Sequence, residues 1–461
     1  MKKRIVASML MVSMAFGLAA CGGSTTAEAP AETPAETPAE TPAETPAETP
    51  AETTDDAEEA VTLRFYNYAL SETAKADWWT NVISTFEAEN PNIDIETITV
   101  DYNSMISTFT NDIASGLSVD LVYGEVSWVP ALADAGFIQA PANVLDTDFY
   151  NGYYGHVMDQ FEYNGEYFGV PHYYTNSVVF VNHELLGAAG IDAANYPVTQ
   201  DGLQEWIDTL GAYYDGDDSV STIFGMATSE VPATGANVNA LYTAFGGTLI
   251  NEDGTLADLT SAENKLALEE TLEFYSSLIN DGHTQENLKL KDYRSAFGAG
   301  NVCMYVDSSW GYAQITEVDP SGTGAFTSTM PLPTSLGTNG TGDSLVESHC
   351  FLLGSMMTDA QKSATDKFIQ YCTSTEVMEG YLNDIGIAFI AHENMEDCAV
   401  SPILEGALDG ESNVVGQTQI PAMVSVQTEL ATMVLNYAIN GMTADEAISN
   451  YIDQANYYIN Q

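Results

Sequence analysis

The sequence predicts an α/β protein whose mostly parallel sheets are flanked by helices and divided between two lobes. Segments with strand-like and helix-like periodicity alternate along the chain after residue 60. Val178–Val181 is an unbroken apolar run, which is typical of a strand covered on both faces. About 400 residues follow residue 60, more than a single hydrophobic core normally supports. We therefore expect two lobes, each with its own core.

The first elements alternate regularly between strand and helix. Short apolar segments predict strands, and apolar residues spaced three or four apart predict helices. The expected strands are 62–66, 93–100 and 120–123, and the expected helices end near Asn90, Gly116 and Gly136. Apolar residues with the same helical spacing predict a further helix over 203–210. Later helices are expected to begin at capping boxes, in which Thr is followed three residues later by Glu or Gln: Thr260–Glu263, Thr358–Gln361 and Thr443–Glu446.

The N-terminus is typical of an exported lipoprotein. A basic start precedes an apolar stretch, 5–17, that is shorter than a membrane span. Small residues then lead to Cys21, and the segment 18–21 closely resembles a bacterial lipobox. The resemblance implies a signal peptide at 1–20, acylation of Cys21 and anchoring on the extracytoplasmic face of the cell membrane. An ordinary secreted protein with a chance cysteine is the alternative.

Residues 21–60 predict a disordered stalk between the anchor and the folded domain. The tetrad Pro-Ala-Glu-Thr runs six times from Pro30 to Thr53. The tetrad has no apolar periodicity, its prolines break helices, and every repeat adds a like charge. The folded part of the chain is therefore expected at 61–461.

Composition narrows the classes of function. A net charge of -55 repels nucleic acid and anionic ligands, and it either serves solubility or attracts cations. Cys303, Cys350, Cys372 and Cys398 match no zinc pattern; buried free thiols are favoured, and disulfides stay open. The chain lacks a Gly-x-Ser-x-Gly elbow, a His-Glu-x-x-His motif and a phosphate-binding Gly-Lys-Ser/Thr loop. We expect no enzyme, no cofactor and no metal.

Four segments in order resemble the carbohydrate-binding family of extracellular solute-binding proteins of ABC importers, which includes maltose-binding protein. They are 86–93, 115–122, 164–182 and 297–304. Trp310 follows the end of the last segment by six residues. The resemblance covers essentially 61–461. It implies a type II periplasmic-binding-protein-like fold, with two lobes joined by crossing hinge strands. Lobe 1 would comprise about 61–173 and 346–390, and lobe 2 about 174–345 and 391–461.

The resemblance also implies a function and its partners. The protein would capture a neutral mono- or oligosaccharide in a cleft between the lobes and deliver it to the transmembrane subunits of an ABC permease. We expect a monomer. Two alternatives stay open: the same fold binding a cationic ligand such as a polyamine, and a surface polysaccharide-capturing module without an importer. The sugar, its chain length and the number of cell membranes are left undetermined.

Candidate ligand-binding residues follow the ends of the expected strands, where the loops of a parallel sheet converge. Sugars need aromatic faces for stacking and side chains that hydrogen-bond hydroxyls. The candidates are Tyr66, Tyr68, Tyr123, Glu125, Trp128, Tyr173, Tyr174, Asn176 and Trp310. Trp310 occupies the position matching the family's stacking residue and is the strongest of them. Because the chain holds 25 Tyr, core packing is the alternative for each tyrosine, and a structural role is favoured for His349 beside Glu347.

Overall fold

A computed structural model describes most of the chain after residue 59. The chain divides into Met1–Asp56 and Ala57–Gln461. The described residues are 60–309, 311–318, 327–386, 389–395, 398, 402–404, 406 and 414–461. The lipobox with Cys21, the repeat stalk and Trp310 lie outside the described residues.

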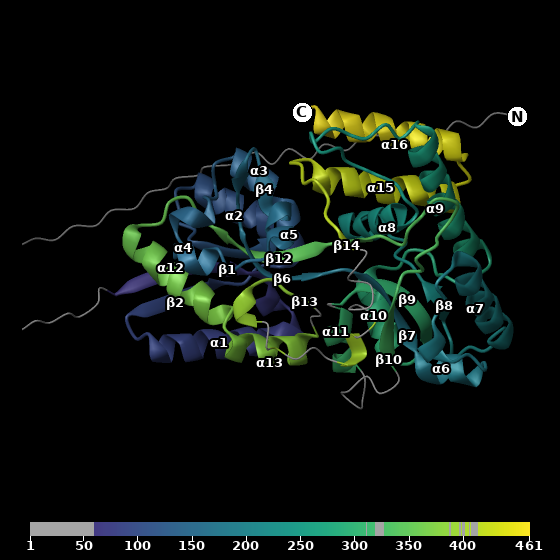
Figure 1. Cartoon of the computed structure of the whole chain (residues 1–461), viewed down its shortest axis with the longest axis horizontal. Coiled ribbons are helices and arrows are strands. Elements are labelled where there is room, and N and C mark those ends of the chain that lie inside the picture. The colour runs from purple at the N-terminus through teal and green to yellow at the C-terminus, as the bar shows by residue number, and fades with distance from the viewer. Residues whose placement is uncertain are drawn as a thin grey trace, which may run out of the picture. The chain divides into compact units, whose positions relative to one another are not determined.

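The first sheet has six strands in the order β13-β6-β12-β3-β1-β2 (Figure 1). Its strands are β1 (Val61–Asn67), β2 (Ile93–Ile98), β3 (Leu121–Glu125), β6 (Val170–Thr175), β12 (Glu347–Leu353) and β13 (Phe389–Ile390). Strand β1 pairs in parallel with β2 and β3. Strand β12 is antiparallel to β3 and β6, and β13 is antiparallel to β6.

The second sheet has four strands in the order β10-β7-β9-β8. Its strands are β7 (Ser177–Asn182), β8 (Thr222–Gly225), β9 (Val302–Ser308) and β10 (Thr327–Pro331). Of the pairings between these described strands, β8 with β9 is parallel, and β7 is antiparallel to both β9 and β10. Two small sheets pair β4 (Glu162–Tyr163) with β5 (Glu166–Tyr167), and β11 (Ser344–Leu345) with β14 (Val414–Val415).

The predicted α/β class is confirmed, but both sheets are mixed rather than mostly parallel. Strand β6 leaves the first sheet and continues through Asn176 directly into β7 of the second. Parallel neighbouring strands are usually connected by a crossover helix. A strand that follows a segment of the other sheet has no such connection to its neighbours, so its direction is not fixed as parallel. Local alternation along the sequence carries no information about that direction.

Helices cover both faces of the first sheet. Phe65 of β1 packs against Trp79 of α1 (Thr73–Glu89) and against Phe368 of α12 (Asp359–Cys372). The next residue, Tyr66, packs on the opposite face against Phe109 of α2 (Met105–Ala114). Side chains alternate along a strand, so β1 is buried between two helix layers. The remaining helices beside this sheet are α3 (Val129–Asp134), α4 (Thr147–Tyr150), α5 (Gly155–Met158) and α13 (Thr375–Ile385).

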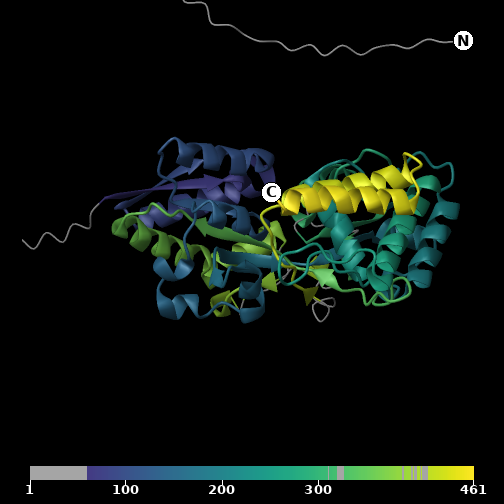
Figure 2. The same cartoon turned by 90° about the horizontal axis from the view of Figure 1, so that it is seen from above.

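One face of the second sheet packs in a separate hydrophobic cluster, whereas Phe180 of β7 and Tyr305 of β9 belong to the cluster that also contains the first sheet. Helix α15 packs against both α8 and α16, and α15 and α16 lie side by side in yellow in Figures 1 and 2. The helices of this half are α6 (His183–Ala188), α7 (Gln200–Tyr213), α8 (Pro232–Ala244), α9 (Ala262–Asn280), α10 (Leu290–Gly298), α11 (Gly311–Val318), α15 (Met423–Ala438) and α16 (Ala444–Ile459).

Short 3₁₀ helices occupy many connections. They are η1 (Tyr68–Ser71), η2 (Tyr102–Ser104), η3 (Val126–Trp128), η4 (Pro141–Asn143), η5 (Asp159–Phe161), η6 (Ala193–Asn195), η7 (Glu393–Met395) and η8 (Pro402–Leu404). Two of them, η1 and η3, directly follow the C-terminal ends of β1 and β3.

Two of the three predicted capping boxes are confirmed. Thr358 and Thr443 cap α12 and α16, each with its reciprocal side-chain bond. The third prediction is wrong by one residue, because Ser261 caps α9. The hydroxyl of Thr260 instead donates to Asp258 at 2.6 Å, in a local turn that competes with capping.

The cysteines agree with the expectation of free thiols. Cys303, Cys350 and Cys372 are buried and free, and Cys398 is partly buried. Among the described residues, no helix combines the length and apolarity that crossing a bilayer requires.

Candidate functional site

Five of the side chains at the C-terminal edge of β3 and on the crossing strands share one face of the first sheet. Glu125 pairs with His349, and His349 pairs on its other side with Tyr173. Directly paired residues project to the same face, and so do residues two apart on one strand. Tyr123, Glu125, Glu347, His349 and Tyr173 therefore lie together.

Aromatic rings surround this edge. The Tyr68 ring centroid lies 5.6 Å from that of Tyr123, 5.3 Å from that of Tyr102 and 6.3 Å from that of Trp128. His349 stacks on Tyr173 with centroids 5.1 Å apart and ring planes at 19°. We call Tyr68, Tyr102, Tyr123, Trp128 and Tyr173 the aromatic cluster. It gathers here because Tyr68, Tyr102 and Trp128 follow three parallel strands at their carboxyl ends.

Two hydroxyl groups donate hydrogen bonds to the Glu125 carboxylate. The Tyr102 hydroxyl donates to Glu125 Oε2 at 2.8 Å, and the Ser127 hydroxyl reaches the same oxygen at 3.4 Å. The other oxygen, Oε1, faces His349 Nε2 at 3.7 Å. His349 Nδ1 in turn is hydrogen-bonded to the Tyr68 hydroxyl. The carboxylate is thus oriented by neighbours from η2, η3 and β12.

Burial shifts the titration of these groups. Burial raises the pKa of Glu125 to about 7, although the hydrogen bonds from Tyr102 and Ser127 act in the opposite direction and lower it. Burial also raises the pKa of Glu347 to about 8, and the negative charge of Glu125 adds to that shift. The pKa of His349 is lowered well below its usual range, mainly by burial, so the imidazole is neutral at pH 7.

Two ion pairs, one at the start of α1 and one in the second half of the chain, affect the pKa values of these carboxylates. Lys75 Nζ lies 2.9 Å from Glu72 and 6.0 Å from the Tyr68 ring centroid. Arg294 holds Asp307 by two hydrogen bonds of 2.7 and 2.9 Å, and the Asp307 side chain is fully buried. The charge of Arg294 lowers the pKa of Glu347, against the larger raising effect of burial, so this pair belongs to the same electrostatic environment.

The link between the two sheets is tied by hydroxyl groups beside the site. Ser309 donates its backbone N–H to Thr175 Oγ1 at 3.1 Å, and the two hydroxyls are 2.7 Å apart. Asn176, between β6 and β7, is buried. Tyr174 faces away from the aromatic cluster and stacks on Phe389 of β13, with centroids 4.8 Å apart and planes at 10°. Tyr174 and Asn176 therefore belong to the link between the sheets.

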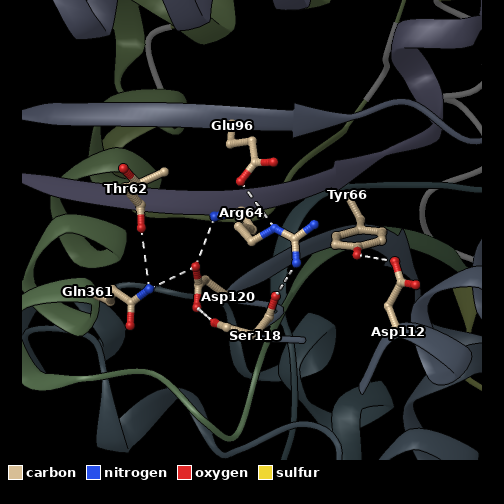
Figure 3. A network of polar contacts seen from close by, with 8 residues as sticks. All are labelled: Thr62, Arg64, Tyr66, Glu96, Asp112, Ser118, Asp120 and Gln361. Atoms are coloured by element: carbon tan, nitrogen blue, oxygen red, sulfur yellow. Dashed lines mark hydrogen bonds and ion pairs between the residues drawn. The ribbon is translucent and has the colours of Figure 1, made fainter. Parts of the chain in front are cut away.

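Tyr66 does not join the other predicted residues. Its hydroxyl donates to Asp112 of α2, and its ring lies 5.9 Å from the Arg64 guanidinium carbon (Figure 3). Figure 3 also shows Arg64 bonded to Glu96 and Asp120, a network that ties β1 to its neighbours. The strand alternation sends Tyr66 to the α2 face, and Asn67 occupies the face of Tyr123 instead.

The structure adds residues that the sequence reasoning missed. Tyr102 follows β2 and could have been found by the same strand-end rule that gave Tyr68. Glu347 and His349 lie near each other in the sequence of β12, where the sequence favoured a structural role for His349. The pairing of Arg294 with Asp307, and the approach of Lys75 to Tyr68, have no local sequence signal.

The model of the bacterial extracellular solute-binding protein family matches residues 81–400. The chain therefore belongs to this family, whose members are binding proteins and not enzymes. Curated relatives include binding proteins of Brucella abortus and Brucella suis, each 24% identical over 250 residues, or 53% of this chain. The aligned region covers 57% of the length of each relative, so the chain spans about half the length of these relatives.

Solved structures share the fold. A solute-binding protein of an ABC transporter from Thermotoga lettingae, bound with α-D-tagatose, has a TM-score of 0.74 at 18% identity, covering 87% of this chain and 100% of that one. The GacH receptor of Streptomyces glaucescens, solved with acarbose, has a TM-score of 0.72 at 17% identity, covering 87% and 98%. Maltose-bound MalE3 of T. maritima has a TM-score of 0.72 at 17% identity, covering 86% and 100%. At these low identities the TM-scores show the fold alone, which is that of the periplasmic binding proteins.

Proposed function

We propose that this protein captures a mono- or oligosaccharide between its two lobes and delivers it to the transmembrane subunits of an ABC permease. The observation that carries the proposal is the aromatic cluster around Glu125 at the carboxyl ends of β1, β2 and β3. Ring faces suit the C–H faces of sugars, and a carboxylate accepts hydrogen bonds from their hydroxyls. The fold neighbours carry tagatose, acarbose and maltose, which supports the choice of a sugar.

In this proposal Tyr68, Tyr123, Glu125, Trp128 and Tyr173 form the first lobe's side of the site. Trp310 contributes a stacking ring from the second lobe, as the sequence motif suggests. The lobes are those proposed from the sequence, and the link through Asn176 acts as a hinge. Hinge closure around a ligand converts binding into a shape that a partner can recognise.

Calorimetric titration of the protein from Ala60 onward tests this function. We expect at least one mono- or oligosaccharide of a broad panel to bind with 1:1 stoichiometry and to be recovered unchanged. Binding of a polyamine with no saccharide binding would contradict the proposal. So would hydrolysis of a bound glycoside that stops on replacing one carboxylate.

The proposed anchor makes a separate prediction about location. Cys21→Ser removes the thiol that acylation requires, so the full-length protein is expected in the medium or periplasm and not in the membrane fraction. Fractionation and immunoblotting measure this, with Cys398→Ser as the matched control that stays membrane-bound. A Cys21→Ser protein that remained with the membranes would show that the anchor is elsewhere.

A further inference from the structure

The charged groups at the candidate site do not balance. Four carboxylates are involved, and the two basic side chains are each already paired, Lys75 with Glu72 and Arg294 with Asp307. Among the described residues, neither Glu125 nor Glu347 forms an ion pair with Lys or Arg. A buried carboxylate without a counter-ion is costly, which is why the pKa values of both groups are raised, and a cationic ligand would favour the charged form of each.

His349 does not supply the missing charge. It lies on the same face as Glu125 and Glu347, but burial keeps its pKa well below 7. His349 Nδ1 is hydrogen-bonded to the Tyr68 hydroxyl, and Nε2 lies 3.7 Å from Glu125 Oε1. A neutral His349 therefore supplies no positive charge to Glu125.

The surroundings of the two carboxylates suit an ammonium group. The rings of Tyr68, Tyr102 and Trp128 stand 5.3–6.3 Å from one another beside Glu125. Aromatic faces attract cations, and this attraction strengthens when water is excluded. Lys75 already lies over the Tyr68 ring in this way, which shows that the cluster accommodates an amine.

An independent feature indicates that the ligand also offers oxygen atoms. Asn67 is fully buried, and its side-chain oxygen accepts a hydrogen bond from the Ala69 backbone at 2.9 Å. Its amide nitrogen Nδ2 has no hydrogen-bond partner among the described residues. Asn67 pairs in register with Tyr123, so its side chain lies on the face of the aromatic cluster. A buried amide donor requires an acceptor, such as a hydroxyl or ring oxygen of a saccharide.

We infer that the ligand is an amino-substituted saccharide, whose protonated amine is bound by Glu125 and Glu347 while Asn67 binds one of its oxygens. The inference rests on the proposed saccharide-binding function and narrows it to one chemical class, which carries a positive charge where the sequence led us to expect a neutral sugar. It uses two carboxylates that no Lys or Arg pairs with among the described residues, the aromatic cluster and the amide donor of Asn67.

Matched sugar pairs test the inference on the unaltered protein. Glucosamine is compared with glucose, galactosamine with galactose, and chitosan dimers to tetramers with their N-acetylated counterparts, by calorimetry at pH 7.5. We expect the amine-bearing member of the best-binding pair to bind at least about tenfold more tightly, which corresponds to about 1.4 kcal/mol. Equal affinity within every pair that binds would overturn the inference and leave the saccharide function intact. Binding of spermidine with no binding of any sugar would overturn the saccharide function itself.

Two variants locate the amine subsite. Glu347→Gln and Glu125→Gln keep the shape of each side chain and remove its charge, so each is expected to reduce the amine preference severalfold or more. Glu205→Gln, on the exposed surface of α7, is the matched control and is expected to keep the full preference. Circular dichroism confirms that each variant is folded. Retention of the full preference in both Glu347→Gln and Glu125→Gln would place the amine elsewhere and contradict the inference.

The pH dependence gives a readout with a defined sign. Tyr102, Ser127, Lys75 and Glu72 affect the pKa of Glu125, with His349 3.7 Å away, and Glu125, Asp307 and Arg294 affect the pKa of Glu347. Because the ligand-free pKa values are raised, to about 7 and about 8, protons occupy these carboxylates as the pH falls. A cationic ligand displaces them, so below the pKa of the ligand's own amine, where the ligand charge is constant, its affinity is expected to fall as the pH decreases towards 5.5. An affinity for the amino sugar that stays constant across this range would contradict the assignment.

Discussion

Replacing Arg294 by alanine is expected to destabilise the ligand-free protein by about 3 kcal/mol. Arg294 holds Asp307 through two hydrogen bonds, and the Asp307 side chain has no exposed surface. Removing one partner of a buried pair leaves a charge without compensation, which costs about 3–5 kcal/mol. The lower end of that range applies because Arg294 itself is 20% exposed. Urea denaturation followed by circular dichroism measures the loss.

Lys265→Ala is the matched control for that experiment. Lys265 lies 2.7 Å from Asp445, a comparable distance, but both side chains are well exposed. Exposed ion pairs contribute little because water and salt screen them, so the midpoint of denaturation should barely move. Equal shifts for the two variants would show that the Arg294 pair is not desolvated as the structure describes.

Trp79→Ala is expected to cost about 3–5 kcal/mol of stability, the usual range for truncating a buried tryptophan. Trp79 is fully buried beneath the site, with ring centroids 5.6 Å from Phe65 and 4.9 Å from Tyr123. Trp206 of α7 is the control, because it is only partly buried and its truncation removes less packed surface. Thermal unfolding of both variants is the measurement. A smaller loss for Trp79→Ala than for Trp206→Ala would contradict the described core.

The local elements of the fold could be predicted from the sequence because their signals are local. The apolar spacing of Trp79, Val82 and Phe86 lies within α1, and the apolar run 178–181 lies within β7. The direction of β12 could not be predicted, since it depends on where the chain returns from the second sheet. The cap of α9 was misplaced because Thr260 and Ser261 are adjacent, and only the structure shows which hydroxyl faces the helix.

About half of the candidate site followed from one rule, that loops converge at the carboxyl ends of parallel strands. The rule found Tyr68, Tyr123, Glu125 and Trp128, and the structure brings these four together. It also selected Tyr66, because it ignored the alternation of side chains that places this ring on the α2 face. The ion pairs were missed for a different reason. Arg294 and Asp307 are 13 residues apart and meet only through the packing of α10 on β9.

A crystal structure of the protein from Ala60 onward, grown with its tightest-binding saccharide, tests the central claim most directly. The account predicts the sugar at the carboxyl ends of β1 and β3, with a ring face on Tyr68 or Trp128 and a polar group within hydrogen-bond distance of Glu125. Electron density for the sugar at any other place, with Tyr68, Trp128 and Glu125 still packed against one another as in the ligand-free protein, would contradict it.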